Sequence, residues 1–400
     1  MHGGIVSRQA RIYIGTEAVY GVSMGIYGFV LNLFFLSLGM DTVSIGSLTS
    51  ASIIIMGACA LPLGFLARKT GRRNMYAGGV LMIGTGEVLY VLSPSDALFI
   101  PMIFVAVGMT MVEVSEVQVM YQSCSSDAER VTAYSVSFAV FALCAATGTF
   151  LAGHLPQYIG YRGTLLLSGG ITLAVGTLRM TLLKDDRKIR KTEQGKAAVK
   201  APLREVIDRR FLSFLAVIAL HGALGNMIGP FANLILKYRL GWQDGRISAL
   251  MSCSSVCIFI FALYTPKIQR RRMYRPGMYL TGYAVLIAIS MGLAFCKSMA
   301  VFVLLFLLRA GAETVLKNMI DSATYLMLED KQKDIYAGAR SLTKGAVGAL
   351  TALLTGFLLN RMQMGLVFTA AAGLMLCAGA LFIFFIAPIL GKEKEKEQTL

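Results

Sequence analysis

Residues 64–73 read GFLARKTGRR, a short basic segment between two long apolar stretches. The flanking stretches, 42–67 and 74–93, are each long enough to cross the roughly 30 Å hydrocarbon core of a bilayer as a helix. Basic residues in a short loop between two such helices are typical of the cytoplasmic side of a membrane, where they contact anionic head groups. The segment therefore predicts a tight cytoplasmic turn between two membrane-spanning helices.

The composition extends this interpretation to the whole chain of 400 residues. Apolar residues make up 56% and charged residues 15% of the sequence, whereas soluble domains average about 45–50% and about 25%. We therefore expect an all-α membrane protein, built as two six-helix bundles with pseudo-symmetry. Cutting the sequence at charges, Pro and Gly clusters predicts twelve helices at 12–38, 42–67, 74–93, 96–121, 130–154, 161–183, 210–238, 243–266, 276–296, 299–328, 336–360 and 362–388.

The charges divide the chain and orient it. We expect an N-terminal bundle at 1–183, a cytoplasmic linker at 184–209, a C-terminal bundle at 210–390 and a disordered tail at 391–400. With the N-terminus inside, the predicted cytoplasmic segments hold 27 Lys and Arg and the opposite side holds 6. The positive-inside rule then places both termini on the cytoplasmic side of a bacterial-type inner membrane. The net charge of +16 lies mainly in these loops, which favours membrane lipids over nucleic acid as a partner.

The two halves of the sequence resemble each other. LGMDTVSIGSL at 38–48 and LGWQDGRISAL at 240–250 share Leu, Gly, Ile and Leu at a separation of 202 positions. RRNMY at 72–76 and RRRMY at 270–274 are separated by 198 positions. A third pair, 200 positions apart, is Glu113 and Glu313. Parallel repeats of this kind occur in secondary transporters, where the substrate site lies between the halves near the middle of the membrane.

The basic segment and the six-plus-six layout resemble the major facilitator superfamily. The family pattern at this place is Gly-x-Leu-Ala-Asp-Arg-x-Gly-Arg-Arg/Lys. The chain keeps Gly64, Leu66, Ala67, Gly71, Arg72 and Arg73, and has Arg68 for Asp and Lys69 for Arg. The resemblance implies a gating role for Gly64, Arg68, Gly71, Arg72 and Arg73. In the family, the Asp locks the cytoplasmic gate, so Arg68 puts the energetics of that gate in doubt. The alternative is that these residues only anchor the loop on the membrane.

The resemblance also implies how the protein works. The two bundles would expose a central cavity, lined by the first, fourth, seventh and tenth helices, to each side in turn. A second motif, GTFLAG at 148–153, weakly resembles the family's antiporter signature, with Thr149 for Pro and Ala152 for Gly. It favours export, and close helix packing by small residues is the alternative. We expect a monomer that needs no cofactor.

Ionisable residues inside a bilayer usually face a cavity or a partner, and they concentrate on the predicted cavity helices. In the fourth helix, Glu113 and Glu116 share one face with Met109 and Met120. Two carboxylates one turn apart repel each other, so one of them is expected to hold a proton near neutral pH. Such a pair can exchange a proton for a cationic substrate. The alternative is that both carboxylates pair with cations on neighbouring helices.

The other cavity helices supply further candidates. In the tenth helix, Arg309, Glu313, Lys317 and Asp321 alternate in sign at spacings of four, which predicts either a self-neutralised ladder or a cation for a substrate carboxylate. Glu313 is a further candidate for proton coupling, and a Gly229-Pro230 break in the seventh helix is expected to act as a hinge. Glu87, in the third helix, is expected to be solvated or at the level of the head groups. Further candidate substrate contacts are Glu17, Tyr20, Met24, Tyr27, Asn226 and Asn233. His221 is expected to be a hydrogen-bonded interior histidine, with a proton carrier as the alternative.

Motifs for bond-making chemistry do not occur in the sequence. It has no Walker loop, no Gly-x-Ser-x-Gly and no His-Glu-x-x-His, so we expect neither ATP hydrolysis nor enzymatic activity. Seven Cys without a CxxC motif predict neither zinc nor disulfides. We therefore expect a proton-coupled secondary transporter that exports a small organic cation or zwitterion. The alternatives are a proton symporter importing a zwitterionic nutrient or metal chelate, and a lipid or lysolipid flippase.

Overall fold

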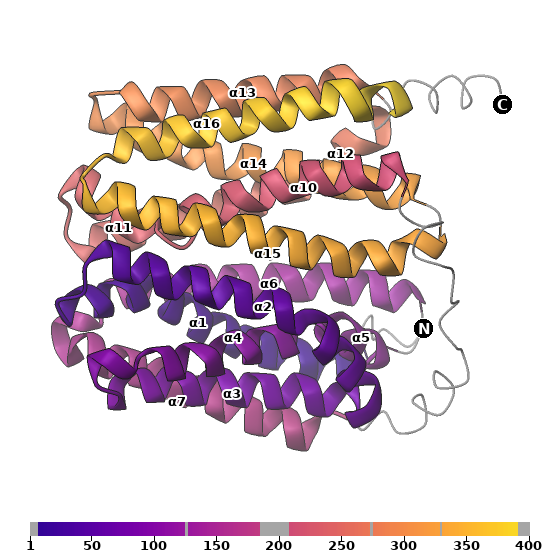
Figure 1. Cartoon of the computed structure of the whole chain (residues 1–400). Helices are drawn as coiled ribbons and strands as arrows, with labels where there is room; N and C mark the ends of the chain where they lie inside the picture. The colour runs from indigo at the N-terminus through magenta and orange to yellow at the C-terminus, as the bar shows by residue number, and fades with distance from the viewer. Residues whose placement is uncertain (1–6, 125–126, 185–207, 273–274, 329, 391–400) are drawn as a thin grey trace. The chain divides into compact units, whose positions relative to one another are not determined.

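The computed structural model describes residues 7–124, 127–184, 208–272, 275–328 and 330–390, which form helices joined by short turns (Figure 1). Twelve helical segments in these ranges are long and apolar enough to cross a membrane. This confirms the predicted all-α membrane fold. Most of the predicted linker 184–209 and all of the predicted tail 391–400 lie outside the described residues.

The chain forms two compact units, which we call unit 1 and unit 2. Unit 1 comprises Met1–Asp41, Ala51–Ala198 and Trp242–Ser252. Unit 2 comprises Thr42–Ser50, Val199–Gly241 and Cys253–Leu400. Each unit therefore combines most of one half of the sequence with a short segment from the other half.

Unit 1 is built around two central helices, α1 (Arg8–Ser37) and α3 (Arg72–Leu92). Helix α1 packs against α6 and α7, and α3 packs against α4 and α7 (Figure 1). The other helices of this half are α2 (Thr42–Thr70), the short η1 (Ser95–Ala97), α4 (Phe99–Glu113), α5 (Glu116–Gln122), α6 (Asp127–Ala152) and α7 (Pro156–Leu182).

Small residues bring α1 and α6 into close contact. A Cβ atom added to Gly148 would lie 2.0 Å from the Val22 carbonyl oxygen, and one added to Gly25 would lie 2.1 Å from the Ala145 oxygen. Thr149 Oγ1 donates a hydrogen bond to the Gly25 oxygen over 3.3 Å. The Gly-rich end of α6 therefore has a packing role in this structure, as small residues do in many membrane helix pairs.

The helix predicted at 96–121 is interrupted in the structure. Helix α4 ends at Glu113, and α5 begins at Glu116 after a turn at Val114 and Ser115. The continuous helical face on which Glu113 and Glu116 were placed is therefore broken between them. No Gly or Pro marks this break in the sequence, and the apolar periodicity continues across it. The sequence therefore contains no local indication of the break.

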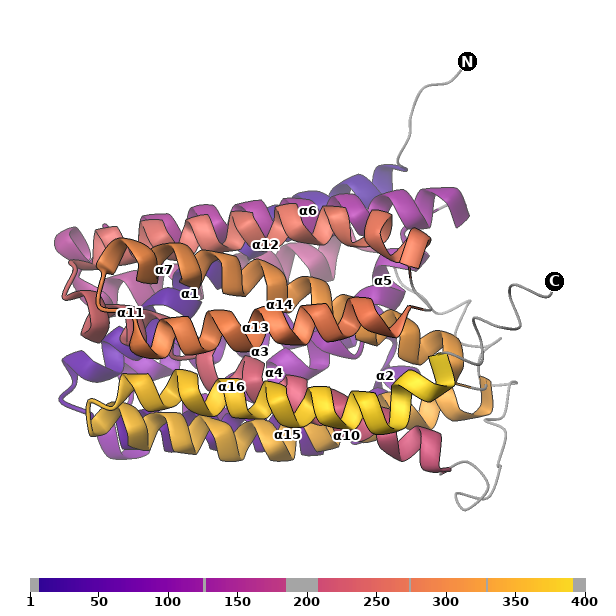
Figure 2. The ribbon, with the colours of Figure 1, turned by 90° about the horizontal axis from the view of Figure 1, so that it is seen from above.

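Unit 2 contains α10 (Arg209–Ile228), which packs against α15 and α16, while α13 packs against α14 and α16 (Figure 2). The predicted break at Gly229-Pro230 is present, because α10 ends at Ile228 and α11 begins at Ala232. The remaining helices are α11 (Ala232–Leu240), α12 (Asp244–Arg272), α13 (Pro276–Phe295), α14 (Met299–Met327), α15 (Asp330–Asn360), α16 (Met364–Leu381) and the π-helical η2 (Phe382–Ile386).

The short segments that come from the other half of the sequence, 242–252 in unit 1 and 42–50 in unit 2, are held by hydrogen bonds within each unit. In unit 1, the hydroxyl of Tyr161 donates to Asp244, and Ser252 Oγ donates to the Ala146 oxygen over 2.8 Å. In unit 2, Thr42 Oγ1 donates to the Gly356 oxygen over 3.0 Å. The starts of α12 and α2 are therefore integral parts of the units that contain them.

Residues 64–70 of the segment 64–73 belong to the end of α2, and the predicted turn between α2 and α3 forms at Gly71 alone. Gly71 has a φ of 95°, a conformation that favours glycine, and it directly precedes α3. Arg73 Nη1 donates to the Leu183 carbonyl oxygen over 3.1 Å, which ties the turn to the end of α7. A Cβ atom added to Gly64 would meet nothing within 4 Å, so close packing does not require a glycine there. Arg72 is partly buried, and the side chain of Arg68 lies outside the described part of the structure.

Candidate functional site

A buried ion pair lies at the centre of unit 1. Glu17 on α1 is 3% exposed and Arg179 on α7 is 0% exposed. Arg179 Nη2 lies 2.7 Å from Glu17 Oε1, and Arg179 Nε donates to Thr16 Oγ1 over 3.2 Å. A buried charge of either sign is costly alone, so each of the two residues depends on the other.

Aromatic rings complete the surroundings of this pair. The guanidinium carbon of Arg179 lies 4.7 Å from the ring centroid of Tyr20 and 4.5 Å from that of Tyr76, within the range of cation–π contacts. The Tyr76 hydroxyl donates a hydrogen bond to Glu17, and its ring stacks on Tyr13 with centroids 5.8 Å apart. Glu17 is thus compensated by a cation and a hydroxyl from within the protein.

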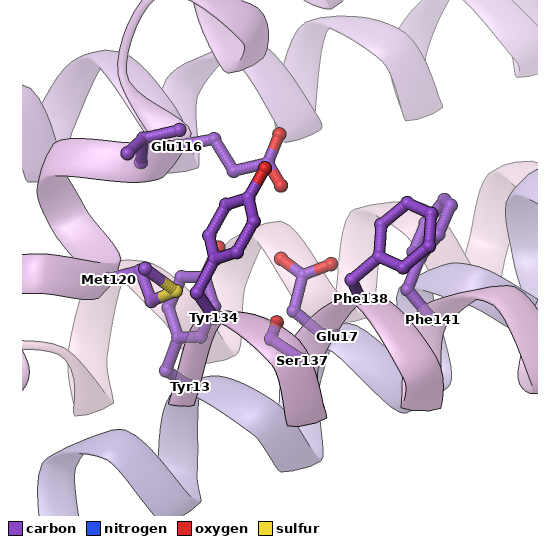
Figure 3. Close-up of a pocket in the computed structure, with 9 residues that line it drawn as sticks. Tyr13, Glu17, Glu116, Met120, Tyr134, Ser137, Phe138 and Phe141 are labelled. Atoms are coloured by element: carbon purple, nitrogen blue, oxygen red, sulfur yellow. The ribbon is translucent and has the colours of Figure 1, made fainter. Parts of the chain in front are cut away.

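A second carboxyl, that of Glu116 at the start of α5, lies in a cavity of about 50 Å³ beside this pair. The Glu116 carboxyl extends beside the ring of Tyr134, with Phe138 and Phe141 farther along the same wall (Figure 3). The cavity combines acids with aromatic rings. Its lining residues are Tyr13, Glu17, Glu116, Val117, Met120, Tyr134, Ser137, Phe138 and Phe141.

Glu116 differs from Glu17 in its electrostatics. It belongs to α5, beyond the candidate span that ends at Glu113. The Glu116 side chain is exposed, but the helices packed around the carboxyl reduce its hydration, which raises its pKa to about 7, and the negative charge of Glu17 acts in the same direction. Arg179 opposes this rise, and Glu113 adds a smaller contribution to it. Glu116 can therefore gain or lose a proton near neutral pH.

The other predicted residues of unit 1 lie around the cavity rather than in its wall. Glu113 is exposed at the end of α4 and does not line this cavity. The ring of Tyr20 is buried against Arg179, and Met24 is partly buried against an apolar cluster that includes Tyr13, Tyr20 and Met120. Tyr27 is 6% exposed and hydrogen-bonds to Tyr90. Of the predicted substrate contacts in unit 1, the structure brings only Glu17 and Glu116 together in one described cavity.

Unit 2 contains a larger polar cavity of about 250 Å³. Helices α10, α14 and α15 supply its wall, which includes the predicted residues Asn226, Glu313 and Lys317. Three cations and two carboxylates lie in this wall. The lining residues are Ile218, His221, Gly222, Gly225, Asn226, Glu313, Lys317, Ile320, Asp321, Arg340 and Lys344.

The predicted charge ladder on α14 forms only in part. Arg309 Nη1 lies 2.6 Å from Glu313 Oε2, as expected for its first step. Asp321 pairs instead with Arg340 of α15, with Nη2 and Oδ2 2.7 Å apart. Lys317 is exposed between these two ion pairs, so a cation remains in the wall of the cavity.

Two polar residues of the seventh predicted span have different positions. His221 lines the cavity, and its Nε2 lies 3.0 Å from the hydroxyl of Tyr283. Asn233 is 1% exposed, and its Oδ1 accepts a hydrogen bond from the Leu234 backbone nitrogen over 2.8 Å. Asn233 is therefore integrated in the start of α11 rather than placed in the described cavity.

Sequence reasoning did not single out Arg179, Arg340 or Lys344. Each is a basic residue within an apolar helix. Such a position could have identified Arg179 as a partner of Glu17, because a buried cation needs a negative charge nearby. Glu87 was expected to be solvated or at the head-group level, and the expectation of a solvated side chain was wrong because it is 0% exposed. The error came from judging depth by distance to the helix end, which ignores burial by neighbouring helices.

Comparisons with known proteins agree with this architecture. A family model described as Major Facilitator Superfamily matches residues 14–312. A comparison with curated protein sequences gives no match. The similarity to known proteins therefore comes from the family model and from solved structures.

The similar solved structures are transporters. A bacterial homolog of the human lysosomal transporter Spinster, in an inward-facing and unoccupied conformation, has a TM-score of 0.75 at 11% identity over 98% of this chain and 99% of its own. The nucleoside transporter NupG has a TM-score of 0.75 at 13% identity, over 94% and 98%. A POT family transporter in complex with 5-aminolevulinic acid has a TM-score of 0.71 at 15% identity, over 96% of both chains. At these identities the similarity shows a shared fold.

Proposed function

The chain belongs to the Major Facilitator Superfamily of membrane transporters, and on this basis we propose that it moves a small zwitterion or organic cation in exchange for protons. The transport would proceed by alternating access, with Glu116 as the residue that binds the proton. Because ordinary carboxyls are ionised at neutral pH, a carboxyl used for proton exchange needs a raised pKa.

The observation that carries this proposal is the contrast between Glu17 and Glu116 in one cavity. Glu17 is paired with Arg179 and accepts a hydrogen bond from Tyr76. Glu116 lies in the same wall, and its pKa is raised to about 7. A substrate cation and a proton would therefore compete for Glu116, and this competition is the physical basis of exchange. The rings of Tyr134 and Phe138 provide faces for a cation.

The cavity of unit 2 supports a zwitterion over a simple cation. Lys317, Arg340 and Lys344 line it together with Glu313 and Asp321, which leaves an excess of one positive charge in the wall. The ion pair of Arg309 with Glu313 increases this excess. A carboxylate or another anionic group of the substrate fits such a wall. Arg309 and Lys317 are the proposed residues for that group.

The proposal also covers further proton sites, the direction of transport and the membrane in which the protein lies. Glu113 and Glu313 are proposed as secondary proton sites, behind Glu116. Export is proposed on the resemblance of GTFLAG at 148–153 to the antiporter signature, although Gly148 also has the packing role described above. The monomer would lie in the cytoplasmic membrane with both termini inside, as the distribution of Lys and Arg predicts.

The proposal is tested by thermal unfolding of the purified protein with a panel of cations, zwitterions, sugars and lysolipids. A ligand at 100 times its dissociation constant adds about 2.7 kcal/mol to the free energy of unfolding. A cation or zwitterion is expected to stabilise the wild type, and Glu116→Gln is expected to abolish the effect. Gln118→Ala, at an exposed neutral residue of α5, serves as the matched control. Stabilisation by lysolipids alone would contradict the proposal in favour of a flippase.

A further inference from the structure

A second buried carboxyl in unit 1 takes no part in the proposed proton exchange. Glu87 on α3 is 0% exposed and lines neither described cavity. Its Oε1 accepts a long hydrogen bond of 3.4 Å from Thr172 Oγ1, and its Oε2 is buried without a hydrogen-bond partner. An ionised carboxylate in this position has lost its hydration, and few hydrogen bonds from the protein replace it.

No Lys or Arg in the described part of the chain compensates this carboxylate. Among the described residues, no Lys or Arg forms an ion pair with Glu87, and Arg179 on the neighbouring α7 is paired with Glu17. The hydroxyls of Tyr27 and Tyr90, which lie in the field of Glu87, hydrogen-bond to each other. A buried charge without a partner is rare in proteins, so the environment of Glu87 is incomplete.

Three hydroxyl groups from two other helices gather beside Glu87. Ser23 Oγ on α1 lies 3.0 Å from Ser168 Oγ and 2.6 Å from Thr172 Oγ1, both on α7. Ser23 Oγ donates to the Ser168 carbonyl oxygen over 2.8 Å, and Ser168 Oγ donates to the Ser23 carbonyl oxygen over 3.0 Å. Ser168 and Thr172 are the hydroxyl groups within hydrogen-bonding range of the Glu87 carboxyl. The hydroxyl oxygens of all three residues keep lone pairs that can coordinate a cation.

We propose that Glu87, Ser23, Ser168 and Thr172 bind a sodium ion. The cluster offers two carboxylate oxygens and three hydroxyl oxygens, the ligand type that hard cations prefer. A single carboxylate balances a monovalent cation, whereas a divalent ion would leave a net buried charge. The described residues hold no group of three or more His, Cys, Asp or Glu side chains, the set that a transition metal would use.

The packing around the cluster favours a small ion. A Cβ atom added to Gly84 of α3 would lie 2.9 Å from Leu173 Cγ of α7. One added to Gly169 of α7 would lie 2.9 Å from Val88 Cγ2 and 3.2 Å from Glu87 Cβ. Gly84 and Gly169 also approach each other, because the Cβ atom of each would lie 3.0 Å and 3.2 Å, respectively, from the other's carbonyl oxygen. The close contact of α3 and α7 beside Glu87 favours the smaller sodium ion over potassium. A bound sodium ion would join α1, α3 and α7, and it would give the transporter a second coupling ion.

The test is the thermal unfolding of the purified protein at a mildly alkaline pH, titrated with sodium chloride at constant ionic strength against potassium and choline chloride. Sodium is expected to raise the unfolding temperature of the wild type by about 2–4 °C at saturation. Glu87→Gln keeps the shape of the side chain without its charge, and it is expected to remain folded and to lose the sodium response. Ser168→Ala keeps the carboxylate and is expected to need about 10-fold more sodium.

Glu116→Gln separates this proposal from the proposed function. It is expected to keep the full sodium response, because Glu116 lies in another cavity. An identical response of the wild type to sodium, potassium and choline would overturn the sodium site. So would stabilisation by acidification with no effect of sodium, because Glu87 would then hold a proton. A sodium response that survives in Glu87→Gln would place the ion elsewhere.

Discussion

The side chain of Arg179 determines how the two carboxyls of the unit 1 cavity differ. Its guanidinium lies 2.7 Å from Glu17 and over the rings of Tyr20 and Tyr76. Glu17 therefore has a partner for its negative charge inside the protein. Glu116 forms no ion pair with another described residue, and its pKa is raised to about 7. Two chemically similar groups thus have different electrostatic environments.

Removing one member of the buried pair is expected to destabilise unit 1. Arg179→Gln leaves Glu17 buried without its cation, at a cost of about 3–5 kcal/mol. The double variant Glu17→Gln with Arg179→Gln removes both charges and is expected to be less destabilised than Arg179→Gln. Thermal unfolding in detergent measures the stability of both variants. The control is Arg162→Gln, at an exposed Arg of the same helix, whose stability is expected to stay within about 0.5 kcal/mol of wild type. A double variant less stable than Arg179→Gln would contradict the pairing.

The raised pKa of Glu116 predicts a pH dependence of stability. The pKa rises from an ordinary value of 4.5 to about 7, so the folded state binds the proton more tightly than the unfolded state. This contribution to stability is present below pH 4.5 and is lost as the pH rises to about 7. The unfolding temperature of Glu116→Gln relative to wild type should therefore increase over this interval and level off above it. Gln118→Ala should show a constant difference, and a constant difference for Glu116→Gln would contradict the account.

At the scale of the helices, glycines fix the contact between α1 and α6 and so place Glu17 relative to α6. Gly148→Ala would put a Cβ atom 2.0 Å from the Val22 carbonyl oxygen, so backbone must move and stability is expected to fall by about 1–3 kcal/mol. Gly28→Ala on α1 is the matched control, since its Cβ atom would meet nothing within 4 Å. Thermal unfolding compares the two variants. Equal stability of both would contradict the close packing.

Some features of the helices could be predicted from the sequence, and others could not. Long apolar runs predicted the twelve spans, and Gly229-Pro230 predicted the break between α10 and α11, because both signals are local. The break between Glu113 and Glu116 and the partner of Asp321 were missed. Both depend on contacts with other helices, which spacing along one helix does not contain. The same reason explains why Arg179 was missed as the partner of Glu17.

At the scale of the whole molecule, each unit carries its own polar cavity. The cavity of unit 1 contains acids and aromatic rings, and that of unit 2 has an excess of cations. The cavity of unit 2 by itself holds groups of both signs, which a zwitterion requires. The sequence repeats, including Glu113 and Glu313 at a separation of 200 positions, predict that the two halves of the sequence are copies of one six-helix unit.

The distribution of Lys and Arg predicts the orientation in the membrane. Lys297 follows α13 and Arg275 precedes it, and both are exposed. In a background without native Cys, Lys297→Cys is expected to react with an impermeant maleimide added to intact cells. Arg275→Cys is expected to react only after the membrane is opened. The opposite pattern would reverse the proposed orientation and place both termini outside.

The central claim is that Glu116 couples protons to substrate movement. The most direct measurement uses proteoliposomes loaded with a pH-sensitive dye, to which the ligand found by thermal unfolding is added. The account predicts that ligand entry changes the internal pH in the wild type and that an imposed pH gradient drives ligand accumulation. Both effects should be lost in Glu116→Gln and kept in Gln118→Ala. Ligand movement without proton movement in the wild type, or unchanged coupling in Glu116→Gln, would contradict the account.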